Sequence, residues 1–119
     1  MRRTALIGFH DPTYLDELAS TLRGLGYDKV TSVSTPVDMI RYAENGGYDT
    51  CLMDVNLGSP GSDVYIPAEQ VFGLVGPTSR HFFAFSANRT AVMGANDAGI
   101  PCKPKTKIFD VLEIISSDV

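Results

Sequence analysis

The stretch Thr50-Cys51-Leu52-Met53-Asp54-Val55-Asn56-Leu57 decides the fold that this sequence predicts. It follows the glycine pair Gly46-Gly47 and begins as an apolar run of strand length without alternation, which is typical of a strand covered on both faces. The run ends on a carboxylate. A desolvated charge is costly unless it is paired or lies at the mouth of a site, so Asp54 is the first candidate functional residue.

Three further apolar runs also end on polar side chains. They are Thr4–Phe9 before His10-Asp11, Phe82–Phe85 before Ser86, and Ile100–Cys102 before Lys103. In an open parallel sheet the carboxyl ends of the strands lie on one side, where the ligand crevice forms. We therefore expect Asp11, Asp54, Ser86 and Lys103 to converge in one site whose chemistry suits a phosphoryl group and a divalent cation.

Apolar runs of strand length alternate with helical patterns along the whole sequence. Asp11-Pro12 and Thr35-Pro36 each place a capping side chain before a proline at the first helical position, a common way for helices to begin. A weaker helix is expected from about Asn88 to Ala98, and Thr106 is expected to cap the last one. Five βα units with right-handed crossovers predict a single α/β domain over residues 1–119, built as a three-layer sandwich.

Composition narrows the classes of function. Fourteen acidic against ten basic residues give a net charge of −4, which argues against non-specific binding to nucleic acid. No apolar run approaches the roughly 18 residues of a membrane helix, and Met1-Arg2-Arg3 leads directly into a strand pattern, so no signal peptide is expected. Cys51 and Cys102 lie inside apolar runs and are interpreted as small buried hydrophobes in a reducing, cytoplasmic compartment.

Four short motifs carry a resemblance to a known family. They are Asp11-Pro12, Leu52-Met53-Asp54, Phe85-Ser86-Ala87 and Lys103-Pro104, each at the end of an apolar run. In this order they resemble the receiver domain of two-component response regulators, over nearly the whole chain. The resemblance implies the flavodoxin-like strand order 2-1-3-4-5, with the first and last helices on one face.

The resemblance also implies a function and a set of partners. The chain would be a signalling domain rather than an enzyme, phosphorylated by a histidine kinase or a phosphotransfer protein. Its output would pass through protein contacts, to an unknown downstream protein or within a homodimer. Neither nucleic acid nor a membrane would be bound directly.

Specific roles follow for the residues that match the family motifs. Asp54 would be the phosphoacceptor, Ser86 would bond a phosphoryl oxygen, and Lys103 would pair with Asp54 or with the phosphate. Mg²⁺ would lie between Asp11, Asp54 and the backbone carbonyl of Asn56. The Lys103–Pro104 peptide is usually cis in the family, and a cis bond costs little only before proline.

The first strand departs from the family pattern. Where the family has two adjacent acids, this sequence has Phe9 and His10, and Asp11 comes one place later. Mg²⁺ prefers hard oxygen ligands in octahedral geometry, which phenylalanine cannot supply and histidine supplies poorly. The departure predicts weak or absent magnesium binding and slow or absent phosphorylation.

Structural interpretations compete with these roles. Asp11 and Ser86 could be helix caps, and Lys103 could be a surface lysine. His10 is expected to be a partly buried or rim histidine rather than a ligand. One alternative function is a pseudo-receiver, which uses the same fold for protein contacts without phosphorylation. A remote alternative is a phosphohydrolase of the haloacid dehalogenase type, although that family has an acid where this sequence has Asn56.

Overall fold

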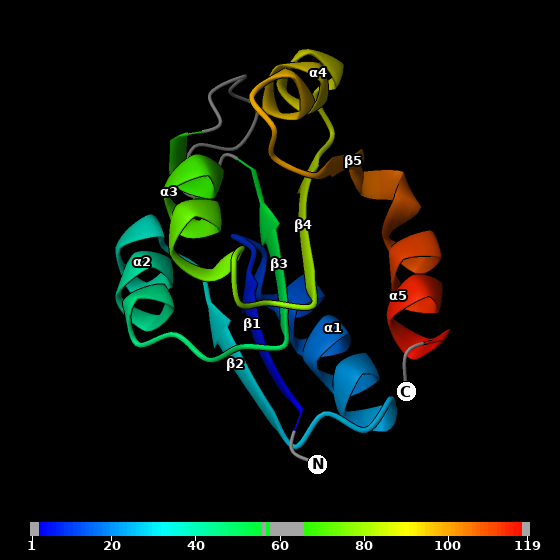
Figure 1. The fold of residues 1–119 in the computed structure, drawn as a ribbon. Coiled ribbons are helices and arrows are strands. Elements are labelled where there is room, and N and C mark those ends of the chain that lie inside the picture. The colour runs from blue at the N-terminus through cyan, green and yellow to red at the C-terminus, as the bar shows by residue number, and fades with distance from the viewer. Residues whose placement is uncertain (1–2, 56, 58–65, 118–119) are drawn as a thin grey trace.

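The computed structural model describes residues 3–55, 57 and 66–117. In this part of the chain, five strands form one parallel sheet in the order β2-β1-β3-β4-β5 (Figure 1). The strands are β1 (Thr4–Gly8), β2 (Lys29–Val33), β3 (Thr50–Asp54), β4 (His81–Ser86) and β5 (Cys102–Pro104). The helices are α1 (Pro12–Gly24), α2 (Pro36–Glu44), α3 (Ile66–Val75), α4 (Arg89–Asp97) and α5 (Ile108–Ser117), with a 3₁₀ turn, η1 (Lys105–Lys107), before the last. The predicted fold class and strand order are confirmed.

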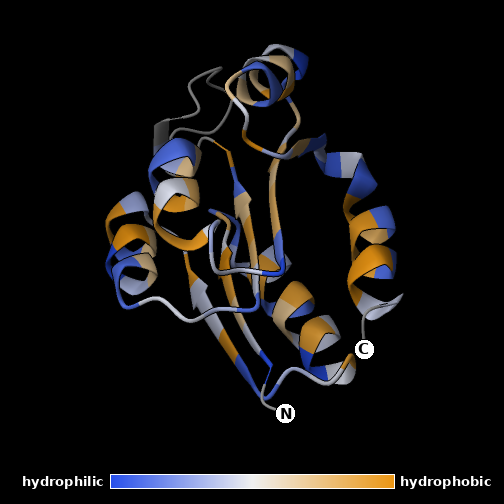
Figure 2. Cartoon of the chain, viewed as in Figure 1, coloured by the Kyte–Doolittle hydropathy of each residue, from blue (hydrophilic) through white to orange (hydrophobic). Residues whose placement is uncertain are grey.

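The helices cover both faces of the sheet and produce two hydrophobic cores. Helices α1 and α5 lie on one face, and α2, α3 and α4 lie on the other (Figure 1). Hydrophobic residues gather on the central strands and on parts of the covering helices (Figure 2). All five residues of β3 are buried, as expected for a central parallel strand covered on both sides. Within the described ranges, no helix is long and apolar enough to cross a membrane.

Side-chain caps fix where the helices begin. The Asp11 carboxylate accepts hydrogen bonds from the N–H groups that follow it at the start of α1. Thr35 caps α2, and Asn88 caps α4 with bonds of 2.8 and 3.2 Å. These caps satisfy N–H groups that have no partner inside the helix. Each therefore sets the point at which the chain leaves the carboxyl edge of the sheet.

The last strand begins two residues later than the sequence predicted. The expected strand was Ile100–Cys102, whereas β5 comprises Cys102–Pro104. Lys103, which was expected just beyond the strand, therefore lies inside it. Lys105 is the lysine that directly follows the strand.

The shift originates at the end of α4. Gly99 has a φ of 86°, and its N–H donates to the Asn96 carbonyl at 3.0 Å. The Ile100 N–H donates to the Ala95 carbonyl at 2.9 Å. This pair of bonds is a Schellman motif, in which a left-handed glycine closes the helix. Because Ile100 completes that motif, the strand cannot begin there.

The side chain of Asn96 ties the end of α4 to β5. Its amide nitrogen donates to the Cys102 carbonyl at 3.0 Å, and its amide oxygen accepts from the Cys102 N–H at 3.1 Å. The two bonds replace those that a neighbouring strand would make. They fix the position of β5, and with it the position of the residues that follow.

Gly8 allows α2 to pack closely on β1. A Cβ atom at this position would lie 2.6 Å from the sulfur of Met39 and 3.1 Å from a methyl carbon of Leu57. Real Cβ atoms essentially never approach other atoms as closely as the first distance. The absence of a side chain at Gly8 therefore sets the spacing between the sheet and α2.

Candidate functional site

Asp54 ends β3, and both oxygens of its carboxylate are paired. The residue is 3% exposed. Its Oδ1 lies 2.9 Å from the Lys105 Nζ. Its Oδ2 accepts a hydrogen bond from the His10 backbone N–H at 3.3 Å and lies 3.0 Å from the His10 Nδ1. Pairing on both sides compensates the cost of burying this charge.

Lys105 lies between the carboxylate and two aromatic rings. Its Nζ is 5.7 Å from the centroid of the Phe9 ring and 5.5 Å from that of Tyr14. The two rings meet edge to face, with centroids 4.8 Å apart. A cation within about 6 Å of an aromatic face is attracted by the ring quadrupole. The rings and the carboxylate together hold the ammonium group at the end of the sheet.

Lys103 does not occupy this position. It is exposed, and it lies opposite Phe85 in the register of β4 and β5. In the described part of the chain, the ammonium group that contacts Asp54 is that of Lys105. The expectation that Lys103 pairs with Asp54 is therefore wrong, because Lys105 takes that position. The difference of two residues equals the two residues by which β5 begins later than predicted. The described peptide bonds include no cis bond, so the Lys103–Pro104 bond is trans.

Ser86 ends β4, beside the end of β3. It is 5% exposed, and the register places its neighbour Phe85 opposite Asp54. The Ser86 hydroxyl accepts a hydrogen bond from the Asn88 N–H at 2.9 Å, so it orders the turn before α4. The cap of that helix is Asn88 rather than Ser86.

The Asp11 side chain faces the start of α1. Its Oδ1 accepts hydrogen bonds from the Thr13 N–H at 3.0 Å and from the Tyr14 N–H at 3.4 Å. This is the helix-capping role that the sequence left open for Asp11. The backbone of Asn56, the third expected magnesium ligand, lies outside the described residues.

The described side chains do not fit a magnesium site. Lys105 and His10 take the two oxygens of Asp54, the Asp11 carboxylate caps a helix, and Phe9 is fully buried. The described ranges contain no group of three or more His, Cys, Asp or Glu residues that could hold a metal ion. Because Mg²⁺ is held by oxygen ligands in near-ideal octahedral geometry, the described side chains would have to rearrange before they could offer their oxygens to the ion.

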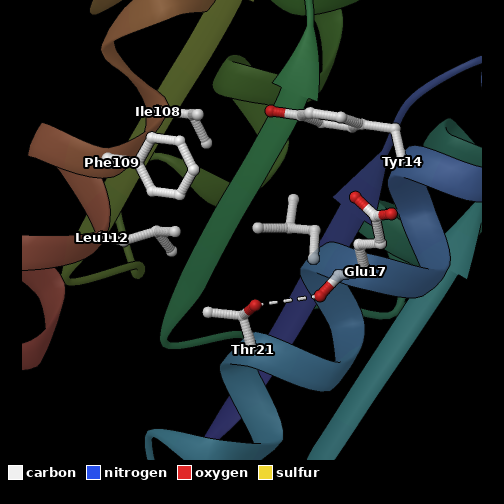
Figure 3. Close-up of a pocket in the computed structure, with 7 residues that line it drawn as sticks. Tyr14, Glu17, Thr21, Ile108, Phe109 and Leu112 are labelled. Carbon is white, nitrogen blue, oxygen red and sulfur yellow. Dashed lines mark hydrogen bonds between the residues drawn. The ribbon is translucent and has the colours of Figure 1, made fainter.

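Tyr14 joins the Asp54 site to the surface between α1 and α5. Burial, and secondarily the Asp54 carboxylate, raises the pKa of Tyr14 to about 12. The hydroxyl is buried and has no hydrogen-bond partner among the described residues. Figure 3 shows the ring extending from α1 toward Ile108, at the start of α5.

Sequence reasoning missed three members of this site. Lys105 was overlooked in favour of the lysine before a proline, and His10 was expected to be a partly buried or rim residue, with no contact to Asp54 foreseen. Tyr14 was not singled out, although it follows the Asp11 cap by three residues and therefore lies one turn into the helix. The sequence did carry one signal for them, because each missed residue lies within three positions, along the chain, of a residue that was identified.

Comparisons with known proteins give structural relatives. No family model and no curated protein matches the sequence. The receiver domain of a sensor histidine kinase from Pseudomonas aeruginosa PAO1 aligns with a TM-score of 0.68 and 22% identity, over 98% of this chain and 99% of that one. That domain was crystallised with a magnesium ion coordinated in its active-site cleft.

Two further solved structures align at similar levels. A CheY-like response regulator receiver domain from Methanospirillum hungatei JF-1 gives a TM-score of 0.70 and 20% identity over 100% of both chains. A response regulator receiver protein from Sinorhizobium medicae WSM419 gives 0.68 and 17%, over 98% of this chain and 95% of that one. Each of the three alignments covers almost the whole of both chains. This chain therefore has the flavodoxin-like fold of response regulator receiver domains.

Proposed function

We propose that this chain is a receiver-type signalling domain in which Asp54 is the phosphoacceptor and Lys105 is its cationic partner. The observation that carries the proposal is the buried ion pair of 2.9 Å at the end of the central strand. It joins an acid and an ammonium group where an open parallel sheet binds its ligands. The donor would be a histidine kinase or a phosphotransfer protein, and the output would pass through protein contacts.

The proposed reaction uses one oxygen of Asp54 as the nucleophile. This oxygen attacks the phosphorus of a phosphohistidine, the P–N bond breaks, and its electron pair leaves with the imidazole. The product is an acyl phosphate. The phosphoryl group adds about −1.5 to −2 of charge, and Lys105 is the nearest ammonium group to receive it. Ser86, at the adjacent strand end, is proposed as a hydrogen-bond donor to a phosphoryl oxygen.

Magnesium binding is proposed to be weak. The Pseudomonas receiver domain coordinates this ion in its cleft, whereas here His10 lies against one Asp54 oxygen and Asp11 caps a helix. An ion of this kind would have to displace the His10 contact and draw Asp11 away from α1. Both changes cost free energy, so millimolar rather than micromolar affinity is expected.

A second candidate function is supported by the His10 contact. Lys105 compensates the charge of Asp54, and His10 occupies the other carboxylate oxygen, without phosphate or metal. This favours a pseudo-receiver, in which the folded domain acts through protein contacts alone. The two candidates differ in whether Asp54 takes up phosphate.

The test is incubation with acetyl phosphate, with and without magnesium, followed by intact-mass spectrometry. A phosphoryl adduct that disappears in Asp54→Asn supports the first candidate, and Lys105→Met should slow its formation while Lys103→Met should not. No adduct at saturating donor and magnesium would refute the first candidate and leave the pseudo-receiver.

His10→Asp tests what limits the site. It replaces the imidazole by a second carboxylate at a residue whose side chain is 40% exposed, so the fold should tolerate it. Phe9 is fully buried against Tyr14 and Phe85, and a charge there would disrupt the core. We expect His10→Asp to strengthen magnesium binding, measured by NMR titration. An unchanged affinity would mean that His10 does not limit the metal.

A further inference from the structure

The outer edge of β4 is only partly covered by β5. Pairing between the two strands begins at Ala84 and Cys102 and ends at Ser86 and Pro104, and Figure 1 shows β5 beside the carboxyl end of β4. The first residues of β4, 81–83, pair with β3 on their inner side. On their outer side, the described ranges of the chain contain no strand. The sheet therefore has an open edge at the amino end of β4.

The backbone of Phe82 faces this open edge. Successive residues of a strand direct their N–H and carbonyl groups to alternate sides. The His81 N–H donates inward, to the Asp49 carbonyl at 3.1 Å, whereas the Ala84 N–H donates outward, to the Pro101 carbonyl at 2.9 Å. Phe82 is in phase with Ala84, so its N–H and its carbonyl both point outward.

Pro101 is the reason why β5 does not pair with Phe82. In a regular parallel ladder, the residue that accepts from the Ala84 N–H would also donate its own N–H to the Phe82 carbonyl, but proline has no N–H. Gly99, whose carbonyl would be next in the ladder, closes α4 with a φ of 86°. Phe82 is 6% exposed, and buried backbone groups are nearly always paired. Its two outward groups have no strand partner within the described ranges, so the edge can accept one.

A cavity lies along the same edge. Its volume is about 370 Å³, which is in the range of ligand-binding pockets. Its apolar lining comes from Phe72, Phe82, Phe83 and Pro101. Phe82 belongs to the core under α3, whereas Phe83 packs against the core under α1 and α5. Because the cavity contacts both residues, it follows the edge between the two faces of the sheet.

Charge indicates the kind of segment that fits this edge. Arg80, which is exposed, and His81 also line the cavity, and none of the described lining residues is Asp or Glu. The nearby Asp49 carboxylate accepts from the Thr4 N–H at 3.1 Å and therefore faces β1. A second copy of this chain, bound here about a two-fold axis, would bring Arg80 against Arg80, which is unfavourable. The edge therefore favours a negatively charged partner.

We propose that this open edge of β4 is a docking site for an acidic, extended segment of a partner protein. The backbone of the segment accepts from the Phe82 N–H and donates to the Phe82 carbonyl. One apolar side chain enters the cavity, and a carboxylate lies near Arg80. This is recognition by strand addition at a sheet edge. Because the contacts lie at the amino end of the sheet, the inference does not depend on whether Asp54 accepts phosphate.

The experiment uses the whole chain and two labelled peptides of about six residues. Both peptides alternate valine with a charged residue, which is glutamate in one and lysine in the other. Binding is measured by fluorescence anisotropy and located by NMR chemical-shift changes. We expect the acidic peptide to bind at least about tenfold more tightly than the basic one. The shifts should appear at Arg80, Phe82 and Phe83, and hydrogen exchange of the Phe82 N–H should become slower.

Restoring the missing donor should close the edge. Pro101→Ala supplies an N–H that can pair with the Phe82 carbonyl, so β5 should lengthen and the acidic peptide should bind at least about tenfold more weakly. Protection of the new N–H from hydrogen exchange would report this pairing in the folded protein. Pro104→Ala is the matched control, because it adds an N–H on the outer side of β5, away from Phe82. It should leave the affinity unchanged.

Arg80→Gln tests the charge of the site. We expect it to weaken binding of the acidic peptide about threefold or more and to reduce the dependence of binding on salt. Arg89→Gln is the matched control, because Arg89 is also exposed but lies at the start of α4, beyond the carboxyl end of β4.

Four results would each overturn the proposal. They are equal binding of the two peptides, no binding of the acidic peptide at about millimolar concentration, an unchanged affinity in Pro101→Ala or Arg80→Gln, and self-association through this edge in sedimentation velocity.

Discussion

The conclusion that Lys105, and not Lys103, is the partner of Asp54 can be tested by measuring the free energy of unfolding of two variants. Lys105→Met removes the ammonium group but keeps a side chain of similar length, so the packing of the aliphatic part against Phe9 and Tyr14 is largely retained. It leaves the Asp54 carboxylate, whose side chain is 4% exposed, with His10 as its remaining partner. Lys103→Met removes the same charge from an exposed residue two positions away.

The expected loss follows from the burial of the pair. Removing one partner of a fully buried ion pair costs about 3–5 kcal/mol, because the other charge is left uncompensated. The Lys105 side chain is 29% exposed and His10 stays in contact with Asp54, so the free energy of unfolding should fall by less, about 2 kcal/mol. For a chain of this size that corresponds to a melting temperature lower by roughly 6–12 °C. Lys103→Met should change the free energy of unfolding by less than about 0.5 kcal/mol.

The assay is urea unfolding monitored by circular dichroism. The slope of the free energy of unfolding against urea concentration should be the same in all variants, as expected for two-state unfolding. The double variant Lys105→Met/Asp54→Asn should recover much of the loss, since it removes the charge that was left unpaired. An equal loss in the Lys103 and Lys105 variants, or no recovery in the double variant, would refute the assignment of Lys105 as the partner of Asp54.

Two further predictions concern titration and packing. In an absorbance titration, Tyr14 should ionise at a pH of about 12 rather than near 10. The stability that its protonated form contributes is therefore complete below about pH 10 and is lost as the pH rises through 12. Because burial also raises the pKa of Tyr48, the readout is the loss of one tyrosine's absorbance change near pH 12 in Tyr14→Phe, and Asp54→Asn should lower the midpoint of that change. An absorbance change near pH 12 that is as large in Tyr14→Phe as in the wild type would contradict the assignment. Gly8→Ala should destabilise the fold by about 1–2 kcal/mol in urea unfolding, because the added Cβ would meet the Met39 sulfur. Gly73→Ala in α3, where a Cβ meets nothing within 4 Å, should stabilise the fold by about 0.5–1 kcal/mol. Changes of the same sign in both variants would show that the contact at Gly8 does not limit packing.

The fold could be predicted from the sequence because its signals are local. Asp11-Pro12 and Thr35-Pro36 begin helices where the sequence indicated, and the apolar run at Thr50 became the fully buried central strand. A cap, a proline and an apolar run each act within a few residues. The alternation of such signals therefore determines the order of elements without knowledge of distant contacts.

The lysine could not be identified in the same way. Its identity depends on where β5 begins, which in turn depends on the Gly99 and Ile100 bonds that close α4. Glycine before an isoleucine is compatible with either a helix end or a strand start. The choice between them is made by tertiary packing, including the two bonds from Asn96.

The roles of the acidic residues in the site could also be predicted only in part. The sequence correctly indicated Asp54 at a buried strand end, and it left open whether Asp11 would cap a helix or approach a metal. The structure supports the cap. The contact between His10 and Asp54 joins residues that are 44 positions apart in the sequence. Local sequence patterns do not predict a contact between residues so far apart.

The amide of Asn96 has a consequence for how the molecule meets its neighbours. A strand at the margin of a sheet can recruit a strand from another molecule, which leads to aggregation. Here the Cys102 N–H and carbonyl are both taken by Asn96, and Pro104, two residues further along the strand, has no N–H to offer. A strand from another molecule would find few free donors along β5 and would have to displace the Asn96 amide. The side chain that orients β5 toward the site thus also protects that margin of the sheet from intermolecular pairing.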